Sequence, residues 1–158
     1  MPHPLVPARA DVVIVGSGAI GSSIAYHLAK LGLRDVVLLE RRQLTSGTTW
    51  HAAGLVPQLR ATRTLTELAK YTSELLRSLE AETGQATGFK QNGSVAVALN
   101  DARLEEFQRT GAMGRAFGVH VEFLSPAEAL PRHPPREGRG VAAGLWTPNV
   151  GQTNHIDT

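Results

Sequence analysis

Three glycines near the start of the chain, Gly16, Gly18 and Gly21, have the spacing G-x-G-x-x-G in the segment GSGAIG. In this pattern the first glycine permits a tight turn, the second lets backbone N–H groups approach a pyrophosphate, and the third lets a helix pack closely on a strand. Ala19 and Ile20 would begin that helix, whose positive end would face the anion. These residues therefore predict a dinucleotide-binding turn.

Glu40 lies nineteen residues after Gly21, where a second strand is expected to end. An acid at this position accepts hydrogen bonds from ribose hydroxyl groups. It favours a ribose without a 2′-phosphate, although Arg41 and Arg42 follow directly and could bind such a phosphate. A turn that binds no ligand is disfavoured, because the motif, its flanking elements and the acid occur together. The spacing fits NAD and FAD equally.

A second segment of small and hydroxyl-bearing residues, TSGTTWHAAGLV at 45–56, follows this acid. Its hydroxyl groups could donate hydrogen bonds to a second part of an extended cofactor, and its small residues leave room for a flat ring system. A loop of this kind directly after the ribose acid favours FAD over NAD. The residues that we expect to contact the cofactor here are Ser46, Gly47, Thr48, Thr49, Ala53 and Gly54.

The elements around these two loops predict a βαβ unit. Residues 11–16 (DVVIVG) and 35–40 (DVVLLE) are short apolar runs typical of strands buried on both faces of a parallel sheet. Residues 19–31 should form the helix between them, and Gly32 should end it. A unit of about thirty residues has the expected size. The apolar face of the helix is predicted to consist of Ile20, Ile24, Leu28 and Leu31.

The rest of the chain reads as a mixture of helices and short strands. A helix is expected at 65–83, with Gly84 ending it, and a helix from 101 should be weakened by Gly111 and Gly114. The apolar stripe of the helix at 65–83 would contain Leu65, Leu68, Ala69, Thr72, Leu75, Leu76 and Leu79. Strands are expected at 94–99, 119–123 and 141–149, a loop at 131–140, and a capping box at 125–128.

The change in pattern near Gly88 suggests a domain boundary. Residues 1–88 would form the N-terminal part of an α/β, Rossmann-like domain, and residues 89–158 would begin an α+β domain. We therefore expect a truncated fold, because a two-stranded parallel unit leaves faces and edges without partners.

Composition excludes several classes of function. Hydrophobic residues make up 42% and charged residues 19%, as in a globular protein, and the net charge of +2 is too small to indicate nucleic acid. Without cysteine there can be no thiolate metal site, cysteine nucleophile or cysteinyl flavin. The histidines lack metal-binding spacing, so no metal site is predicted. No targeting or membrane-spanning segment is recognisable, so a cytoplasmic protein without a membrane partner is expected.

The segment LTSGTTWHAAGLV resembles the flavin loop of the sarcosine and dimethylglycine dehydrogenase family, among the D-amino-acid-oxidase-like FAD oxidoreductases. LEAETGQATGFKQNGSVAVA, GRAFGVHVEFLSPAEA and GLWTPNVGQTNHIDT are also similar to this family. The resemblance implies bound FAD, attached covalently through the flavin 8α-methyl group to the histidine that matches His51. It also implies oxidation of an N-methyl amino acid by hydride transfer to flavin N5.

The resemblance sets limits as well. Relatives are several times longer, and their substrate-contacting and proton-handling groups lie mostly downstream, so no catalytic residue is nominated here. Tetrahydrofolate would be a partner only through downstream domains, and missing C-terminal domains or a partner subunit are expected. Two alternatives stay open. One is a non-catalytic FAD-binding or subunit-interaction module, and the other is an NAD-dependent Rossmann enzyme.

Overall fold

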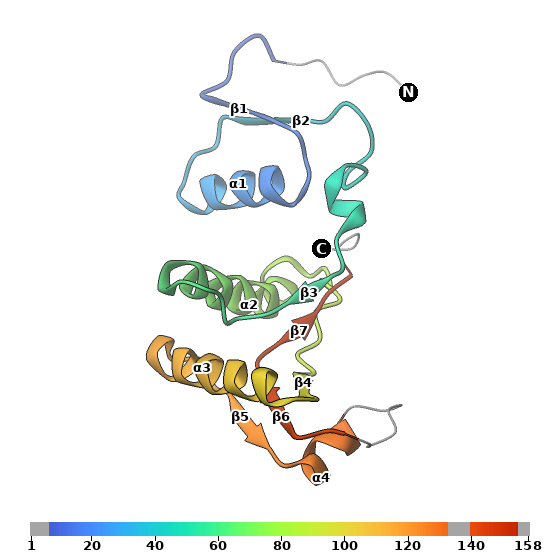
Figure 1. Ribbon diagram of the computed structural model, residues 1–158. Helices are drawn as coiled ribbons and strands as arrows, with labels where there is room; N and C mark the ends of the chain where they lie inside the picture. The colour runs from blue at the N-terminus through green and yellow to red at the C-terminus, as the bar shows by residue number, and fades with distance from the viewer. Residues whose placement is uncertain (1–6, 133–139, 155–158) are drawn as a thin grey trace. The chain divides into compact units, whose positions relative to one another are not determined.

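The computed structural model describes residues 7–132 and 140–154, and the chain divides into two compact units, Met1–Ala53 and Gly54–Thr158 (Figure 1). The division falls between Ala53 and Gly54 rather than near Gly88, so the helix predicted at 65–83 belongs to the second unit. The assignment of residues 1–88 to the N-terminal part of the FAD-binding domain and of 89–158 to part of the substrate domain stays a prediction.

The first unit is the predicted βαβ unit. Strand β1 (Val12–Val15) pairs in parallel with β2 (Val36–Leu39), and helix α1 (Ala19–Lys30) connects them. The 3₁₀ helix η1 (Thr48–His51) follows in the second loop. β-Branched residues favour the strands, and Gly32, at φ +94°, adopts the left-handed conformation just after α1. The mixed α/β fold class is confirmed.

The strands are not buried on both faces, contrary to the prediction. Ile14 is buried on the side of α1, whereas its neighbours Val13 and Val15 are 54% and 84% exposed. Alternate residues of a strand point to opposite faces of the sheet, and within this unit one helix covers one face. The predicted apolar face of α1 is likewise open, with Ile20 and Leu31 about four-fifths exposed.

The second unit contains two small antiparallel sheets and two long helices. β3 (Leu55–Val56) pairs with β7 (Gly151–Gln152), and β6 (Ala143–Thr147) lies between β4 (Ser94–Ala98) and β5 (Glu122–Leu124). The helices are α2 (Arg63–Thr83), α3 (Asp101–Phe117) and the short α4 (Pro126–Ala129), which is followed by η2 (Leu130–Arg132). The core lies between α3 and the three-stranded sheet, around Ala98, Phe107 and Leu145.

The helix ends follow the sequence closely. The Thr62 hydroxyl accepts a hydrogen bond from Leu65 N and begins α2, and Gly84 ends it in the left-handed conformation at φ +75°. The capping box is present, with Ser125 N donating to Glu128 Oε2 at 2.9 Å. The Ser125 hydroxyl also donates to this oxygen, at 2.7 Å. These bonds hold the pKa of Glu128 below its ordinary value.

Two details differ from expectation, and a third is not described by the structure. Leu65 and Leu68 on α2 are half exposed, and its buried residues are Thr66, Ser73 and Leu76. The strand expected at 119–123 occupies Glu122–Leu124, because the chain first reverses through Gly118, where Val119 N donates to Gly114 O. Most of the loop expected at 131–140 lies outside the described residues.

Gly111 and Gly114 have a role that their low helix propensity concealed. Both are buried in α3, and a Cβ on Gly111 would lie 2.6 Å from the Phe123 ring. A Cβ on Gly114 would lie 2.7 Å from Val121 Cγ2 and 3.1 Å from Val119 O. The two glycines therefore let α3 approach β5 and the segment that leads into it, and this contact offsets their cost in the helix.

Candidate functional site

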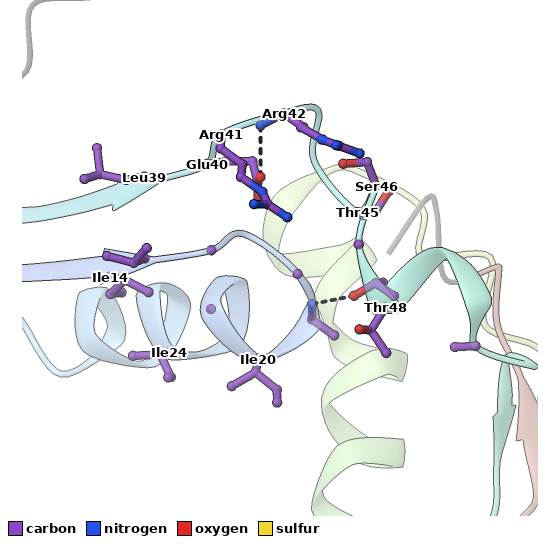
Figure 2. A pocket seen from close by; sticks show the side chains of 18 residues that line it. Ile14, Ile20, Ile24, Leu39, Glu40, Arg41, Arg42, Thr45, Ser46 and Thr48 are labelled. Carbon is purple, nitrogen blue, oxygen red and sulfur yellow. Dashed lines mark hydrogen bonds between the residues drawn. The ribbon is translucent and has the colours of Figure 1, made fainter.

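A cavity of about 840 Å³ opens in the first unit, at the carboxyl ends of β1 and β2 and the N-terminus of α1 (Figure 2). Its volume falls within the roughly 300–1,000 Å³ typical of small-molecule sites. This position, where parallel strands end and a helix begins, is where α/β sheets bind ligands. The lining comprises Ile14, Val15, Gly16, Gly18, Ala19, Ile20, Gly21, Ile24, Leu39, Glu40, Arg41, Arg42, Thr45, Ser46, Gly47, Thr48, Thr49 and Ala52.

The glycine turn has the geometry that its motif requires. Gly16 has φ +102°, in the region that favours glycine, and its N–H donates to Leu39 O at 2.7 Å. A Cβ on Gly21 would lie 1.8 Å from Gly16 O, so only glycine permits this approach of helix and strand. A Cβ on Gly18 would stand 3.0 Å from Thr49 Oγ1, on the floor of the cavity. The turn therefore fits a pyrophosphate held by backbone N–H groups.

Glu40 is fixed beside this turn. Its Oε2 accepts hydrogen bonds from Ser17 N at 3.0 Å and Ser17 Oγ at 3.1 Å. Its Oε1 accepts one from Arg42 N at 3.0 Å, which Figure 2 shows as a dashed line. These bonds, the backbone N–H of Ser17 foremost, hold the pKa of Glu40 below its ordinary value. The side chain is therefore an ionised acceptor, as a ribose hydroxyl requires.

The second loop, residues 45–52, borders the cavity and contacts the first turn of α1. Trp50 N donates to Thr45 O at 3.1 Å and Ala52 N donates to Thr49 O at 3.1 Å, which shapes η1. The hydroxyl of Thr49 accepts a hydrogen bond from Ala19 N at 3.0 Å. Thr45 has φ +62°, which is unusual for a β-branched residue and costs about 1–3 kcal/mol where it occurs. Such strain is typical of binding sites.

His51 lies at the end of η1, beside the cavity rather than in its lining. The ring is exposed, and Nδ1 is 3.3 Å from Gly47 O. Ala53 and Gly54 are likewise absent from the lining, and Gly54 begins the second unit. The structure therefore groups the predicted residues from Gly16 to Thr49 around one cavity and does not bring His51, Ala53 or Gly54 into it.

Several lining residues were not among those predicted. Three of them lie near the ends of the strands and form the sides of the cavity there: Ile14, Val15 and Leu39. A fourth, Ile24, lies one helical turn after Ile20 on α1. These strand ends and this helical spacing were visible in the sequence. The other lining residues that were not predicted as cofactor contacts are Arg42, Thr45 and Ala52.

Other kinds of site find no support in the part of the chain that the structure describes. Residues 7–132 and 140–154 contain no group of three or more histidine or acidic side chains able to hold a metal ion. The helices in these ranges are too short or too polar to cross a membrane.

Comparison with known proteins shows which proteins this chain is similar to. A family model described as DAO, FAD dependent oxidoreductase, matches residues 11–157. Human mitochondrial sarcosine dehydrogenase is 44% identical over 97% of this chain, and human mitochondrial dimethylglycine dehydrogenase is 40% identical over 94%. The mouse mitochondrial pyruvate dehydrogenase phosphatase regulatory subunit is 35% identical over 96% of it.

The solved structures agree. L-proline dehydrogenase from P. horikoshii has a TM-score of 0.87 and 28% identity, covering 96% of this chain and 40% of its own. The chain spans 17% of the length of the three curated relatives named above. The family model matches the chain almost from end to end. The matched residues include the glycine turn, the acid after β2 and the second loop. This chain belongs to the DAO family of FAD-dependent oxidoreductases.

Proposed function

We propose that this chain supplies the FAD-binding site of an oxidoreductase that acts on an N-methyl amino acid of the sarcosine or dimethylglycine type. The observation that carries the proposal is the single cavity that joins the glycine turn, Glu40 and the hydroxyl-rich loop. The similarity to sarcosine and dimethylglycine dehydrogenases supports the substrate class. FAD, when bound, would supply a flavin that accepts a hydride at N5.

The chain's own residues would divide the work of binding. Backbone N–H groups of Gly18, Ile20 and Gly21 would hold the pyrophosphate, since the N–H of Ala19 donates to Thr49 Oγ1. The Glu40 carboxylate would accept hydrogen bonds from the ribose. The loop 45–52 would meet the flavin half of the cofactor. Family membership favours FAD over the NAD alternative.

We further propose that His51 carries the flavin covalently. An imidazole nitrogen is a suitable nucleophile, and the side chain is exposed at the end of the loop that borders the cavity. The resemblance of the loop to the flavin loop of the sarcosine dehydrogenase family supports this role. Tetrahydrofolate, further domains or a partner subunit, and a cytoplasmic location stay predictions.

The test is retention of flavin after denaturation. The chain is loaded with FAD, precipitated with acid and run on a denaturing gel, beside His51→Ala and His27→Ala, a matched control on α1. We expect flavin fluorescence in the wild-type and His27→Ala bands and none with His51→Ala. A dark wild-type band from protein that binds FAD in solution would contradict covalent attachment and leave a non-covalent site.

A non-catalytic role is the second candidate, and one comparison favours it, because the relatives include a protein named as a regulatory subunit. Reduction of an artificial electron acceptor by sarcosine separates the two. Substrate-dependent reduction by the FAD-loaded chain, alone or together with the further domains or partner subunit expected for it, would support the enzyme. Bound FAD that sarcosine and dimethylglycine leave oxidised in both preparations would favour the binding module.

A further inference from the structure

One hydrogen bond joins the loop 45–52 to helix α1. Ala19 N, in the first turn of the helix, donates to Thr49 Oγ1 at 3.0 Å, across thirty residues of sequence. The first N–H groups of a helix have no partner within it, and a side chain at the N-cap usually satisfies one of them. The N-cap of α1 is Gly18, which has no side chain to offer. The Thr49 hydroxyl thus serves as the cap from a distant loop.

Backbone hydrogen bonds within the loop shape its turn. Ser46 N donates to Gln43 O, Trp50 N to both Thr45 O and Gly47 O, and Ala52 N to Thr49 O. The turn also holds Thr45 at φ +62°, a conformation that persists where surrounding contacts fix it. The bond from Trp50 N to Thr45 O is such a contact within the loop, and the bond from Ala19 N to Thr49 Oγ1 joins the loop to α1.

We propose that Thr49 is a positioning residue, which fixes the loop 45–52 against α1 before the cofactor binds. The inference rests on the proposed FAD site and concerns the loop that would meet the flavin half of the cofactor. ADP contains the adenosine and the diphosphate but lacks the flavin, so it would use the glycine turn and Glu40. FAD would need the positioned loop as well. Loss of the Thr49 hydroxyl should therefore weaken FAD binding more than ADP binding.

The experiment compares Thr49→Val, which keeps the shape and removes the hydroxyl, with Thr49→Ser, which keeps the hydroxyl. Dissociation constants for FAD and for ADP are measured by titration calorimetry on the full chain. With Thr49→Val we expect FAD to bind about fivefold more weakly and ADP within about twofold of the wild type, as loss of a helix cap would give. Thr49→Ser should bind both like the wild type.

Two binding results would overturn the proposal. An equal loss for FAD and ADP would make Thr49 a direct phosphate ligand, and no loss for either would leave it without a role. Both leave the proposed FAD site standing. A wild-type chain that binds ADP but not FAD would instead contradict the proposed cofactor.

A measurement without ligand decides the same question if FAD does not bind. Amide hydrogen exchange, read by NMR in the ligand-free chain, should be faster at Ala19 and across residues 45–52 in Thr49→Val than in the wild type or Thr49→Ser. Unchanged exchange in Thr49→Val would overturn the proposal whatever the chain binds. Exchange in the second unit should stay unchanged, which shows that the variant is folded.

Discussion

Glu40 illustrates how one side chain can serve both stability and binding. Its carboxylate satisfies the N–H of Ser17 and the N–H of Arg42, and so holds the end of β2 beside the glycine turn. Because these bonds need the ionised form, the pKa of Glu40 in the folded chain lies below its ordinary value of 4.5. The same oxygens face the cavity, where a ribose would meet them.

The lowered pKa of Glu40 predicts how stability depends on pH. A carboxyl group whose pKa is lower in the folded chain stabilises it fully above the pKa of the unfolded chain, and this stabilisation is lost as pH falls through the folded value. We expect the midpoint temperature of thermal unfolding of the first unit to decrease as the pH is lowered below about 4.5. In Glu40→Gln this decrease should be less steep. Circular dichroism from pH 3 to 7 checks this. An equally steep fall in Glu40→Gln would assign the dependence to other groups.

At the scale of the elements, packing reverses what helix propensity alone would suggest for α3. A glycine in the middle of a helix costs about 1 kcal/mol relative to alanine, so Gly114→Ala should stabilise the chain if propensity decided. The added Cβ would instead lie 2.7 Å from Val121 Cγ2 and 3.1 Å from Val119 O, in a buried position. We expect Gly114→Ala to lower the free energy of unfolding by about 1–3 kcal/mol, measured in urea.

Ala112→Gly is the matched control for this prediction. Ala112 is exposed on the same helix, so its replacement should cost about 1 kcal/mol from propensity alone. If Gly114→Ala raised the free energy of unfolding by the amount that Ala112→Gly lowers it, helix propensity alone would decide. Close packing of α3 against the segment before β5 would then play no part in stability.

For the whole molecule, the sequence predicted local structure better than burial. Strands, helices and their glycine stops depend on neighbouring residues, so β1, α1 and α2 fall close to their expected positions. Burial depends on what covers an element, and Val15 and Ile20 read as core yet lie open. The cavity follows the same rule. Its glycine turn and acid are fixed by spacing, whereas the left-handed Thr45 and the bond from Thr49 to α1 arise from tertiary structure.

We expect the open apolar surface of the first unit to make the chain associate with itself. Val13 is 54% exposed on β1 and Leu31 is 83% exposed after α1, and exposed apolar side chains beside unpaired strand edges favour self-association. Because neither residue lines the cavity, Val13→Thr with Leu31→Gln should reduce association without weakening FAD binding. We expect light scattering to show a lower mean mass at the same concentration, with stability changed by less than about 1 kcal/mol.

A core substitution provides the contrast. Leu124 on β5 is buried, at 6% exposure, so Leu124→Thr should destabilise the second unit by about 2–4 kcal/mol and increase scattering as unfolded chains collect. The two changes thus act in opposite directions on association, although both replace apolar residues by polar ones. If the paired change at Val13 and Leu31 left the mean mass unaltered, association would have to arise from another surface, such as the exposed leucines of α2.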